Sequence, residues 1–220
     1  MARQERAIRT RRAILEGAAR MFNELGYEAS TIGMLIERVQ LTRGGLYFHF
    51  TSKEQLARAV LDEAVTREGV VPQALKMQEW VDLALLLAYR VPREPVLSAS
   101  IQLSVDPKAR SLFGTRWPDW MAVSTQLLTE AKERGELHFH IEPAQVARLV
   151  VGAWTGVQLV TVTLPEGNLS EEVSALFALL LPSIVPPEVL AKLDTSPYRA
   201  EHLLAAARSA DAPPVPVAPS

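Results

Sequence analysis

The residues from Ser30 to Lys53 read STIGMLIERVQLTRGGLYFHFTSK and predict two short helices joined by a tight turn. Ser30 is a favourable N-cap for the first of these helices. The helix itself is predicted from apolar residues at helical spacing, which are Ile32, Leu35, Ile36 and Val39. Thr42 is a second N-cap, and Ser52 with Gln55 forms a capping box that begins the next helix.

Two adjacent glycines, Gly44 and Gly45, stand in the first turn of the second helix. Each costs roughly 1 kcal/mol relative to alanine, which is explained if another molecule must approach the backbone there. A helix that begins with Thr42 and Arg43 followed by two glycines offers backbone N–H groups, a hydroxyl and a guanidinium to a phosphate-rich partner. The stretch therefore favours binding to nucleic acid.

This stretch resembles the DNA-binding helix-turn-helix of the TetR family of bacterial repressors. The most specific mark is the run Leu46–Phe50, LYFHF, followed by Ser52-Lys53-Glu54. Within that family, the segment from Met1 to Arg11 and the step Gly26-Tyr27-Glu28 are most similar to the γ-butyrolactone autoregulator receptors of actinomycetes. The resemblance is strong over residues 3–61 and continues more weakly to about residue 193.

The resemblance implies a DNA-binding surface in this chain. The positions that match DNA-facing residues of the family are Thr42, Arg43, Gly44, Gly45, Tyr47 and His49, and those that match phosphate-clamping residues are Thr31 and Lys53. Arg43 is the best candidate for reading a base edge, because a guanidinium can bind O6 and N7 of guanine together. Leu46 and Phe48 are expected in the core, whereas His49 fits a structural role equally well.

Two residues depart from the pattern of the family. Gln40 stands in the turn where the family usually has glycine, and a positive φ there would cost roughly 1 kcal/mol unless the turn differs. Gly45 stands where a small residue other than glycine is commoner, which loosens the second helix. We therefore expect DNA affinity or site preference to differ from those of relatives.

Charge is distributed unevenly along the 220 residues, although the net charge is only −2. Residues 1–60 hold ten Lys and Arg and six Asp and Glu, which gives +4, and the remainder gives −6. Five arginines, Arg3, Arg6, Arg9, Arg11 and Arg12, crowd the predicted first helix, 3–25. A solvated charged face is the ordinary interpretation, but in front of a helix-turn-helix we favour phosphate contact for some of them.

The rest of the chain predicts an all-α protein with helices broken by proline and glycine. We expect a DNA-binding domain at residues 1–68, a ligand-binding and dimerisation domain at 69–208, and a disordered proline-rich tail at 209–220. There is no cysteine, which excludes a disulfide or thiolate site. The charged N-terminus lacks the apolar core of a signal peptide, and no apolar run is long enough to span a bilayer, so we expect a cytoplasmic protein without membrane contact.

A few polar groups in otherwise apolar helices predict a binding pocket for a small apolar molecule. Thr155, Gln158 and Val162 fall on one face of a predicted helix, with Thr161 beside them. The resemblance aligns Trp120 with the tryptophan that packs on the lactone in the butyrolactone receptors. We therefore expect ligand contacts from Trp120, Thr155, Gln158 and Thr161, although hydrogen bonding within a helix bundle explains the polar residues equally well.

Two helices of the second domain look too apolar for the surface of a monomer. The residues concerned are Ala147, Val150, Val151, Val157 and Val160 in one helix and Val173, Leu176, Phe177, Leu180 and Leu181 in the other. In the family such a pair forms a four-helix bundle across a two-fold axis. We expect a homodimer through these helices, while burial in the core of a single chain is the alternative.

The sequence thus predicts a transcriptional repressor that binds a two-fold operator in double-stranded DNA and is released by a small apolar signal, without a cofactor. One alternative is a regulator of the same fold with an antibiotic or another non-lactone effector. Others are a helical interaction protein without DNA binding and an enzyme with an unrecognised site. The only candidate for a metal cluster is the pair His138 and His140 with Glu136. Their spacing on a predicted loop does not provide a convincing third ligand.

Overall fold

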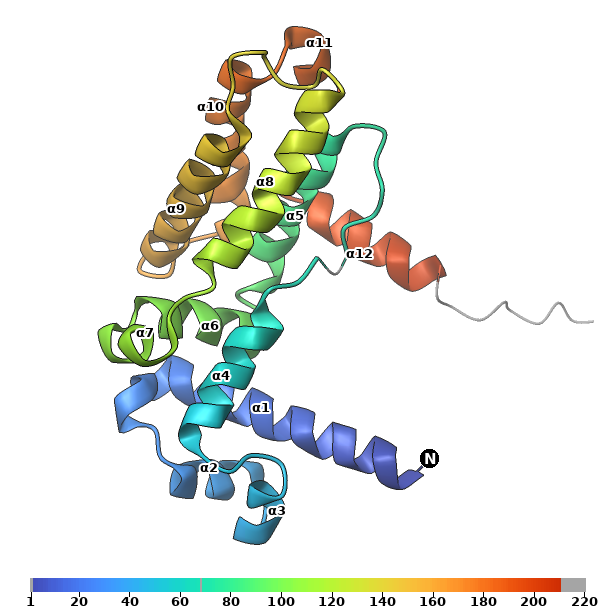
Figure 1. The fold of residues 1–220 in the computed structure, drawn as a ribbon. Coiled ribbons are helices and arrows are strands. Elements are labelled where there is room, and N and C mark those ends of the chain that lie inside the picture. The colour runs from blue at the N-terminus through green and yellow to red at the C-terminus, as the bar shows by residue number, and fades with distance from the viewer. Residues whose placement is uncertain (1, 68, 211–220) are drawn as a thin grey trace, which may run out of the picture. The chain divides into compact units, whose positions relative to one another are not determined.

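The computed structural model describes residues 2–67 and 69–210, excluding the side chains of residues 2, 3 and 208–210. Within these residues the chain forms twelve helices and no strand, which confirms the predicted all-α fold (Figure 1). The chain divides into two compact units. The first combines the residues up to Thr66 with Arg90–Val123, and the second combines Arg67–Tyr89 with the residues from Ser124 onward.

The first unit contains the helix-turn-helix and the helices that support it. These helices are α1 (Ala2–Ala29), α2 (Ile32–Val39), α3 (Arg43–Tyr47), α4 (Lys53–Ala64), α6 (Pro95–Val105), α7 (Pro107–Phe113) and the beginning of α8 (Trp117–Glu133). The first helix, predicted to span residues 3–25, has a kink at Gly26 with φ 74°, after which the chain continues helically to Ala29. Glycine tolerates this backbone conformation, which other residues rarely adopt.

A single apolar core holds the first unit together. Helix α6 packs on both α1 and α4, and α2 packs on α1. The large side chains that are almost completely buried include Phe22, Leu35, Leu46, Phe50 and Leu56. This unit is larger than residues 1–68, because α6 and α7 complete its core, so the predicted functional boundary at residue 68 remains a prediction.

The second unit contains most of α5 (Lys76–Arg90), the rest of α8, and four further helices, which are α9 (Pro143–Thr161), α10 (Leu169–Ile184), α11 (Pro187–Leu190) and α12 (Arg199–Ala210). The Trp80 ring packs edge-on against Phe177 at 5.2 Å, and its indole N–H donates to the Ser124 hydroxyl at 2.6 Å. Arg199 of α12 forms an ion pair with the fully buried Asp82 of α5. The predicted tail lies, from residue 211 onward, outside the described residues.

Several residues of α9 and α10 that we expect at a dimer interface are instead buried within the single chain. Ala147, Val150, Val173, Phe177 and Leu181 are buried within the second unit itself. The large aliphatic side chains of these two helices that are exposed are Leu149, Val160 and Leu179, the last with 83% of its surface exposed. Apolarity around a whole helix does not reveal which side faces its own core, because both faces carry aliphatic residues.

None of the helices in residues 2–67 and 69–210 combines the length and apolar character needed to cross a bilayer.

Candidate nucleic-acid interface

Helix α2 begins one residue later than the sequence predicts. Thr31, not Ser30, is its N-cap, and the Thr31 hydroxyl accepts from the backbone N–H of Met34 at 3.2 Å. Ser30 is buried instead, and its hydroxyl donates to the carbonyl oxygen of Gly26 at 2.6 Å. Either hydroxyl could cap the helix, but the kink at Gly26 leaves carbonyls that Ser30 satisfies, and Thr31 takes over the cap.

The turn between α2 and α3 contains a residue in the left-handed conformation. Gln40 has φ 52° and ψ 42°, and its backbone N–H donates to the carbonyl oxygen of Glu37. The N–H of Leu41 closes the turn on Ile36. The turn therefore accepts a positive φ in a residue that carries a side chain, at a cost of roughly 1 kcal/mol.

Helix α3 begins with an exposed polar turn. The Thr42 hydroxyl accepts from the N–H of Gly45 at 3.1 Å, which confirms the predicted N-cap. A methyl group added at Gly44 would meet no atom within 4 Å, whereas one at Gly45 would lie 3.2 Å from the Thr42 hydroxyl. Gly44 thus leaves backbone open to an approaching molecule, and Gly45 makes room for the capping hydroxyl.

Arg43 and Tyr47 lie one turn apart on the exposed side of α3. The Arg43 guanidinium lies 5.8 Å from the centre of the Tyr47 ring. The tyrosine itself is 38% exposed. In the described part of the chain, no acidic side chain forms an ion pair with Arg43. Its donors are therefore available for an outside partner such as a guanine edge or a phosphate.

Phe48 is not in the core, which corrects the expectation from sequence. Its side chain is 79% exposed, while Leu46 and Phe50 are buried. The ring packs edge-on against His49, with 5.0 Å between the ring centres. Because Leu46 and Phe50 are four residues apart, they face the core together, and Phe48, midway between them, points to the opposite side. An apolar ring is thereby added to the outer surface beside Tyr47.

The Lys53 ammonium at the beginning of α4 is held by backbone carbonyls. It donates to the carbonyl oxygens of Tyr27 at 2.9 Å, Ser30 at 3.0 Å and Glu28 at 3.3 Å. It also lies 4.3 Å from the centre of the Tyr27 ring. These contacts occupy all three N–H donors of an ammonium. Lys53 therefore joins α4 to the end of α1, a role that its match to a phosphate-clamping position did not suggest.

The same contact region alters the acidity of two side chains. Burial, reinforced by the neighbouring Glu54 carboxylate, raises the pKa of Tyr27 to about 12. Hydrogen bonds from its own backbone N–H and from Ser52 lower the pKa of Glu54. The Tyr27 hydroxyl donates to the Glu54 carboxylate at 3.4 Å. At neutral pH the tyrosine is therefore a neutral donor and the glutamate an ionised acceptor.

The arginines of α1 differ in how they are held. Arg6 and Arg9 are exposed, and no acidic side chain of the described residues forms an ion pair with either. Arg11 forms an ion pair with Glu63 at 3.0 Å and lies over the Phe50 ring, and Arg12 pairs with Glu16 at 3.1 Å. The Arg3 side chain lies outside the described residues. Arg6 and Arg9 are thus the best candidates on α1 for phosphate contact.

The four predicted ligand-binding residues are divided between the units. Trp120 lies in the first unit, and Thr155, Gln158 and Thr161 lie in the second. Gln158 is 2% exposed, and its side-chain oxygen is buried without a hydrogen-bond partner. The hydroxyls of Thr155 and Thr161 donate to the carbonyls one turn earlier, at 2.7 and 2.8 Å. Gln158 therefore has the unused hydrogen-bonding capacity, and the contact between these residues and a ligand remains a prediction.

The surroundings of Val162 differ from the expectation, and Glu136 has a structural role. Val162, which we placed on the inward face with Gln158, is 63% exposed beyond the end of α9. The Glu136 carboxylate accepts from the backbone N–H of Met77 at 2.8 Å and so satisfies the beginning of α5. In the described part of the chain, no three side chains of the kind that bind metals come together.

Comparisons with known proteins agree with this geometry. The family described as bacterial regulatory proteins, tetR family, matches residues 14–60, which include α2 and α3. The A-factor receptor protein of Streptomyces griseus is 33% identical over 195 residues, which cover 88% of this chain and 70% of that protein.

Solved structures share the fold over nearly the whole chain. TylP, a TetR regulator from Streptomyces fradiae, has 37% identity and a TM-score of 0.82, covering 92% of this chain and 99% of that one. CprB from Streptomyces coelicolor, in complex with its biological operator sequence, has 26% identity and a TM-score of 0.69, covering 93% and 98%. The helix-turn-helix and the length of these matches establish that the chain belongs to the TetR family of bacterial regulatory proteins.

Proposed function

We propose that this protein is a transcriptional repressor that binds a two-fold operator and is released from it by a small apolar signal of the γ-butyrolactone type. The observation that carries the DNA-binding part is the exposed beginning of α3, where Thr42, Arg43 and Gly44 present donors and open backbone. A relative solved with its operator and another named as the receptor of A-factor support the two parts of the proposal.

In the proposed complex, α3 enters the major groove and its first turn meets the bases. Arg43 binds a guanine edge, Tyr47 and Phe48 contact the sugar-phosphate backbone beside it, and Thr31 places the N-terminus of α2 against a phosphate. Arg6 and Arg9 add sequence-independent attraction, which makes the affinity fall with salt. Lys53 contributes by holding α4 to the end of α1, because its donors are already used.

A homodimer would supply the second half of the DNA contact. We assign its interface to the exposed side of α9 and α10, with Leu149, Val160 and Leu179. Gly152 and Gly156 lie exposed on α9, and a methyl group added to either would meet no atom within 4 Å in the single chain. Leucine and valine beside small residues allow two helices to approach closely, which suits a helical bundle across a two-fold axis.

Gln158 is the residue of the proposed effector site whose structure argues most directly for a ligand. A buried amide oxygen without a partner costs about 1–3 kcal/mol, and a ligand hydroxyl would recover that cost. The amide also carries N–H donors that suit a lactone carbonyl. Trp120 would supply an aromatic wall, as the resemblance implies. The ligand would favour the form of the dimer whose two DNA-binding units are wrongly spaced for successive major grooves.

The effector proposal predicts a separable defect in Gln158→Leu. This change keeps the volume and apolar packing of α9 but removes the amide, so operator binding should stay near wild type. Release by a synthetic alkyl γ-butyrolactone should need about tenfold more ligand. Fluorescence anisotropy of a labelled operator would measure both quantities. Thr163→Val, which removes an exposed hydroxyl just beyond α9, is the matched control. Normal release from Gln158→Leu would place the effector elsewhere.

Trp120→Ala tests the part of the effector proposal that rests on the resemblance. It should abolish release and leave operator affinity unchanged. If no lactone releases the wild-type protein, the ligand that copurifies with it, identified by mass spectrometry, would decide for the alternative of a non-lactone effector.

A further inference from the structure

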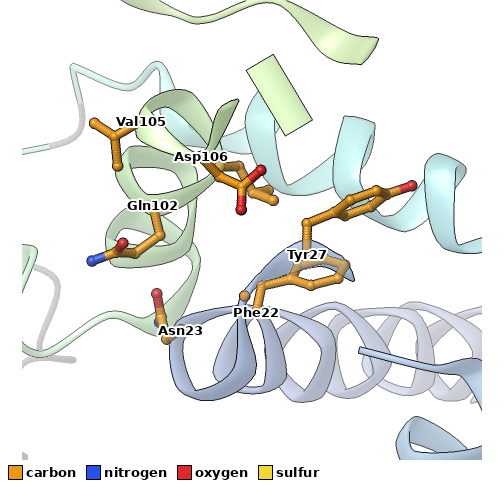
Figure 2. Close-up of a pocket in the computed structure, with 8 residues that line it drawn as sticks. Phe22, Asn23, Tyr27, Gln102, Val105 and Asp106 are labelled. Atoms are coloured by element: carbon orange, nitrogen blue, oxygen red, sulfur yellow. The ribbon is translucent and has the colours of Figure 1, made fainter. Parts of the chain in front are cut away.

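The first unit contains a pocket that the DNA-binding surface does not use. It has a volume of about 190 Å³ and lies between the end of α1 and the end of α6 (Figure 2). An apolar cavity of about 150 Å³ can hold a benzene ring, so this pocket has room for a small organic molecule. Its lining residues are Phe22, Asn23, Gly26, Tyr27, Gln102, Leu103, Val105 and Asp106.

One lining residue carries a buried acceptor that nothing satisfies. The Asn23 side-chain N–H donates to the carbonyl oxygen of Pro95 at 3.1 Å, which orients the amide. Its oxygen is buried and has no hydrogen-bond partner. Figure 2 shows this oxygen pointing away from α1, toward Gln102. An unmade hydrogen bond of this kind is unfavourable in a folded protein, and a donor placed in the pocket would remove the penalty.

A carboxylate stands at the same pocket. One oxygen of Asp106 accepts from the backbone N–H of Ala109 at 2.7 Å and caps α7. The other oxygen lies 3.9 Å from the point where a Cβ at Gly26 would stand, so it overhangs the kink of α1. Within the described residues, Asp106 forms no ion pair. The glycine at residue 26 is needed for the positive φ of the kink itself.

Apart from the Gln102 amide, the remaining walls are apolar. Phe22 and Leu103 are each 1% exposed and Tyr27 is 4% exposed, so the pocket has a hydrophobic floor beside its two acceptors. The Tyr27 hydroxyl is turned away toward Glu54 and offers no donor to the pocket. The occupant that suits two acceptors, one of them charged, above an apolar floor is a donor with positive charge and a short hydrocarbon tail.

We propose that this pocket between α1 and α6 is a second ligand site, which binds a small alkylammonium. The ammonium donates to the Asn23 oxygen and to the free oxygen of Asp106, and its tail lies on Phe22 and Leu103. Because the site bridges α1 and α6 at Gly26, the ligand stabilises the kink from which Ser30 and Lys53 draw their carbonyl partners. The site is independent of the proposed effector site and survives if that proposal fails.

The experiment follows the side-chain amide resonances of Asn23 and Gln102 by NMR in the full-length protein while n-butylammonium chloride is added. We expect saturable shifts of both amides. Matched titrations with n-butanol and sodium butyrate, which have similar tails, should bind at least about tenfold more weakly, because they lack the positive donor. A lysine amide whose α-amine is blocked is titrated as well, because it mimics the lysine side chain of a partner protein. Binding of this derivative would favour a partner's lysine as the occupant, whereas binding of butylammonium alone would favour a free amine.

Asp106→Asn supplies the decisive variant. Asparagine caps a helix as well as aspartate does, so the variant should fold with an unchanged melting temperature while the affinity for butylammonium falls about tenfold or more. Glu37→Gln removes one exposed negative charge of the same unit and should bind as wild type does. Absence of saturable shifts in the wild type, or equal affinities in wild type and Asp106→Asn, would overturn the proposal.

Discussion

Lys53 matches a DNA-contact position of the family, but in the structure its ammonium is held by backbone carbonyls of the chain itself. Its ammonium satisfies carbonyl oxygens at the end of α1, where the kink at Gly26 interrupts the helical hydrogen bonds. Each of these bonds is assisted by the charge of the ammonium, which makes it stronger than a bond between neutral groups. The residue thus joins α4 to the end of α1, and we propose that its effect on DNA binding is indirect.

This interpretation predicts how Lys53→Met changes the dependence of operator affinity on salt. Removing a phosphate contact lowers the slope of log affinity against log salt by about one. Lys53→Met should weaken binding and lower the melting temperature but leave the slope unchanged. Arg9→Gln, on the exposed side of α1, should lower the slope and leave the melting temperature unchanged. Anisotropy titrations over a series of salt concentrations measure the slopes, and a reduced slope in Lys53→Met would restore its role as a phosphate clamp.

At the scale of the elements, the turn between α2 and α3 is strained, and packing in the rest of the first unit holds it in that conformation. Gln40 is the one residue other than glycine with a positive φ in residues 2–67 and 69–210. The buried side chains of Leu35 and Leu46, one on each helix, hold the two helices to the common core and so impose the turn.

Gln40→Gly should therefore stabilise the protein by up to about 1 kcal/mol, because glycine adopts a positive φ without steric cost. Glu37→Gly, in the same helix but with helical backbone angles, should instead destabilise it by about 1 kcal/mol. Urea denaturation of both variants and the wild type gives the two changes in the free energy of unfolding. Equal destabilisation by both substitutions would show that the turn is not strained.

The elements also show what sequence can predict here. Helical spacing, capping residues and proline or glycine breaks located the helix-turn-helix, because these are local effects. The sequence favours Ser30 as the cap of α2 and a buried Phe48, whereas the structure has Thr31 as the cap and an exposed Phe48, since both features depend on the core formed by α1 and α6. The spacing of four residues between Leu46 and Phe50 could have indicated that they share the inward face and that Phe48 faces outward. The partners of Lys53 and the unpaired oxygen of Gln158 arise only from tertiary packing.

At the scale of the whole molecule, the proposed repressor needs two DNA-binding units held at a fixed spacing. One helix-turn-helix contacts only half of a two-fold operator, so a monomer loses half of the contacts. Leu179, with 83% of its surface exposed on α10, has the exposure expected of an interface residue, whereas Phe177, two residues earlier, is fully buried against Trp80.

Leu179→Glu should consequently give folded monomers that fail to bind the operator, because a charge is placed where the partner would bury it. Leu112→Glu, at an exposed apolar residue of α7, should remain dimeric. Phe177→Glu should unfold the second unit, since its charge would be buried within the chain itself. Sedimentation velocity at micromolar concentration separates these outcomes, and a wild-type monomer would contradict the proposed dimer.

The central claim is that the surface from Thr42 to His49 reads an operator. Selection of binding sites from random-sequence DNA tests this claim most directly. The wild-type protein should enrich a two-fold sequence whose half-sites lie about one helical turn apart or slightly more. Arg43→Ala should lose the preference for guanine at one position of each half-site and bind less tightly by about 1–3 kcal/mol. Sequences recovered with the wild-type protein that cannot be distinguished from the starting library would contradict the account.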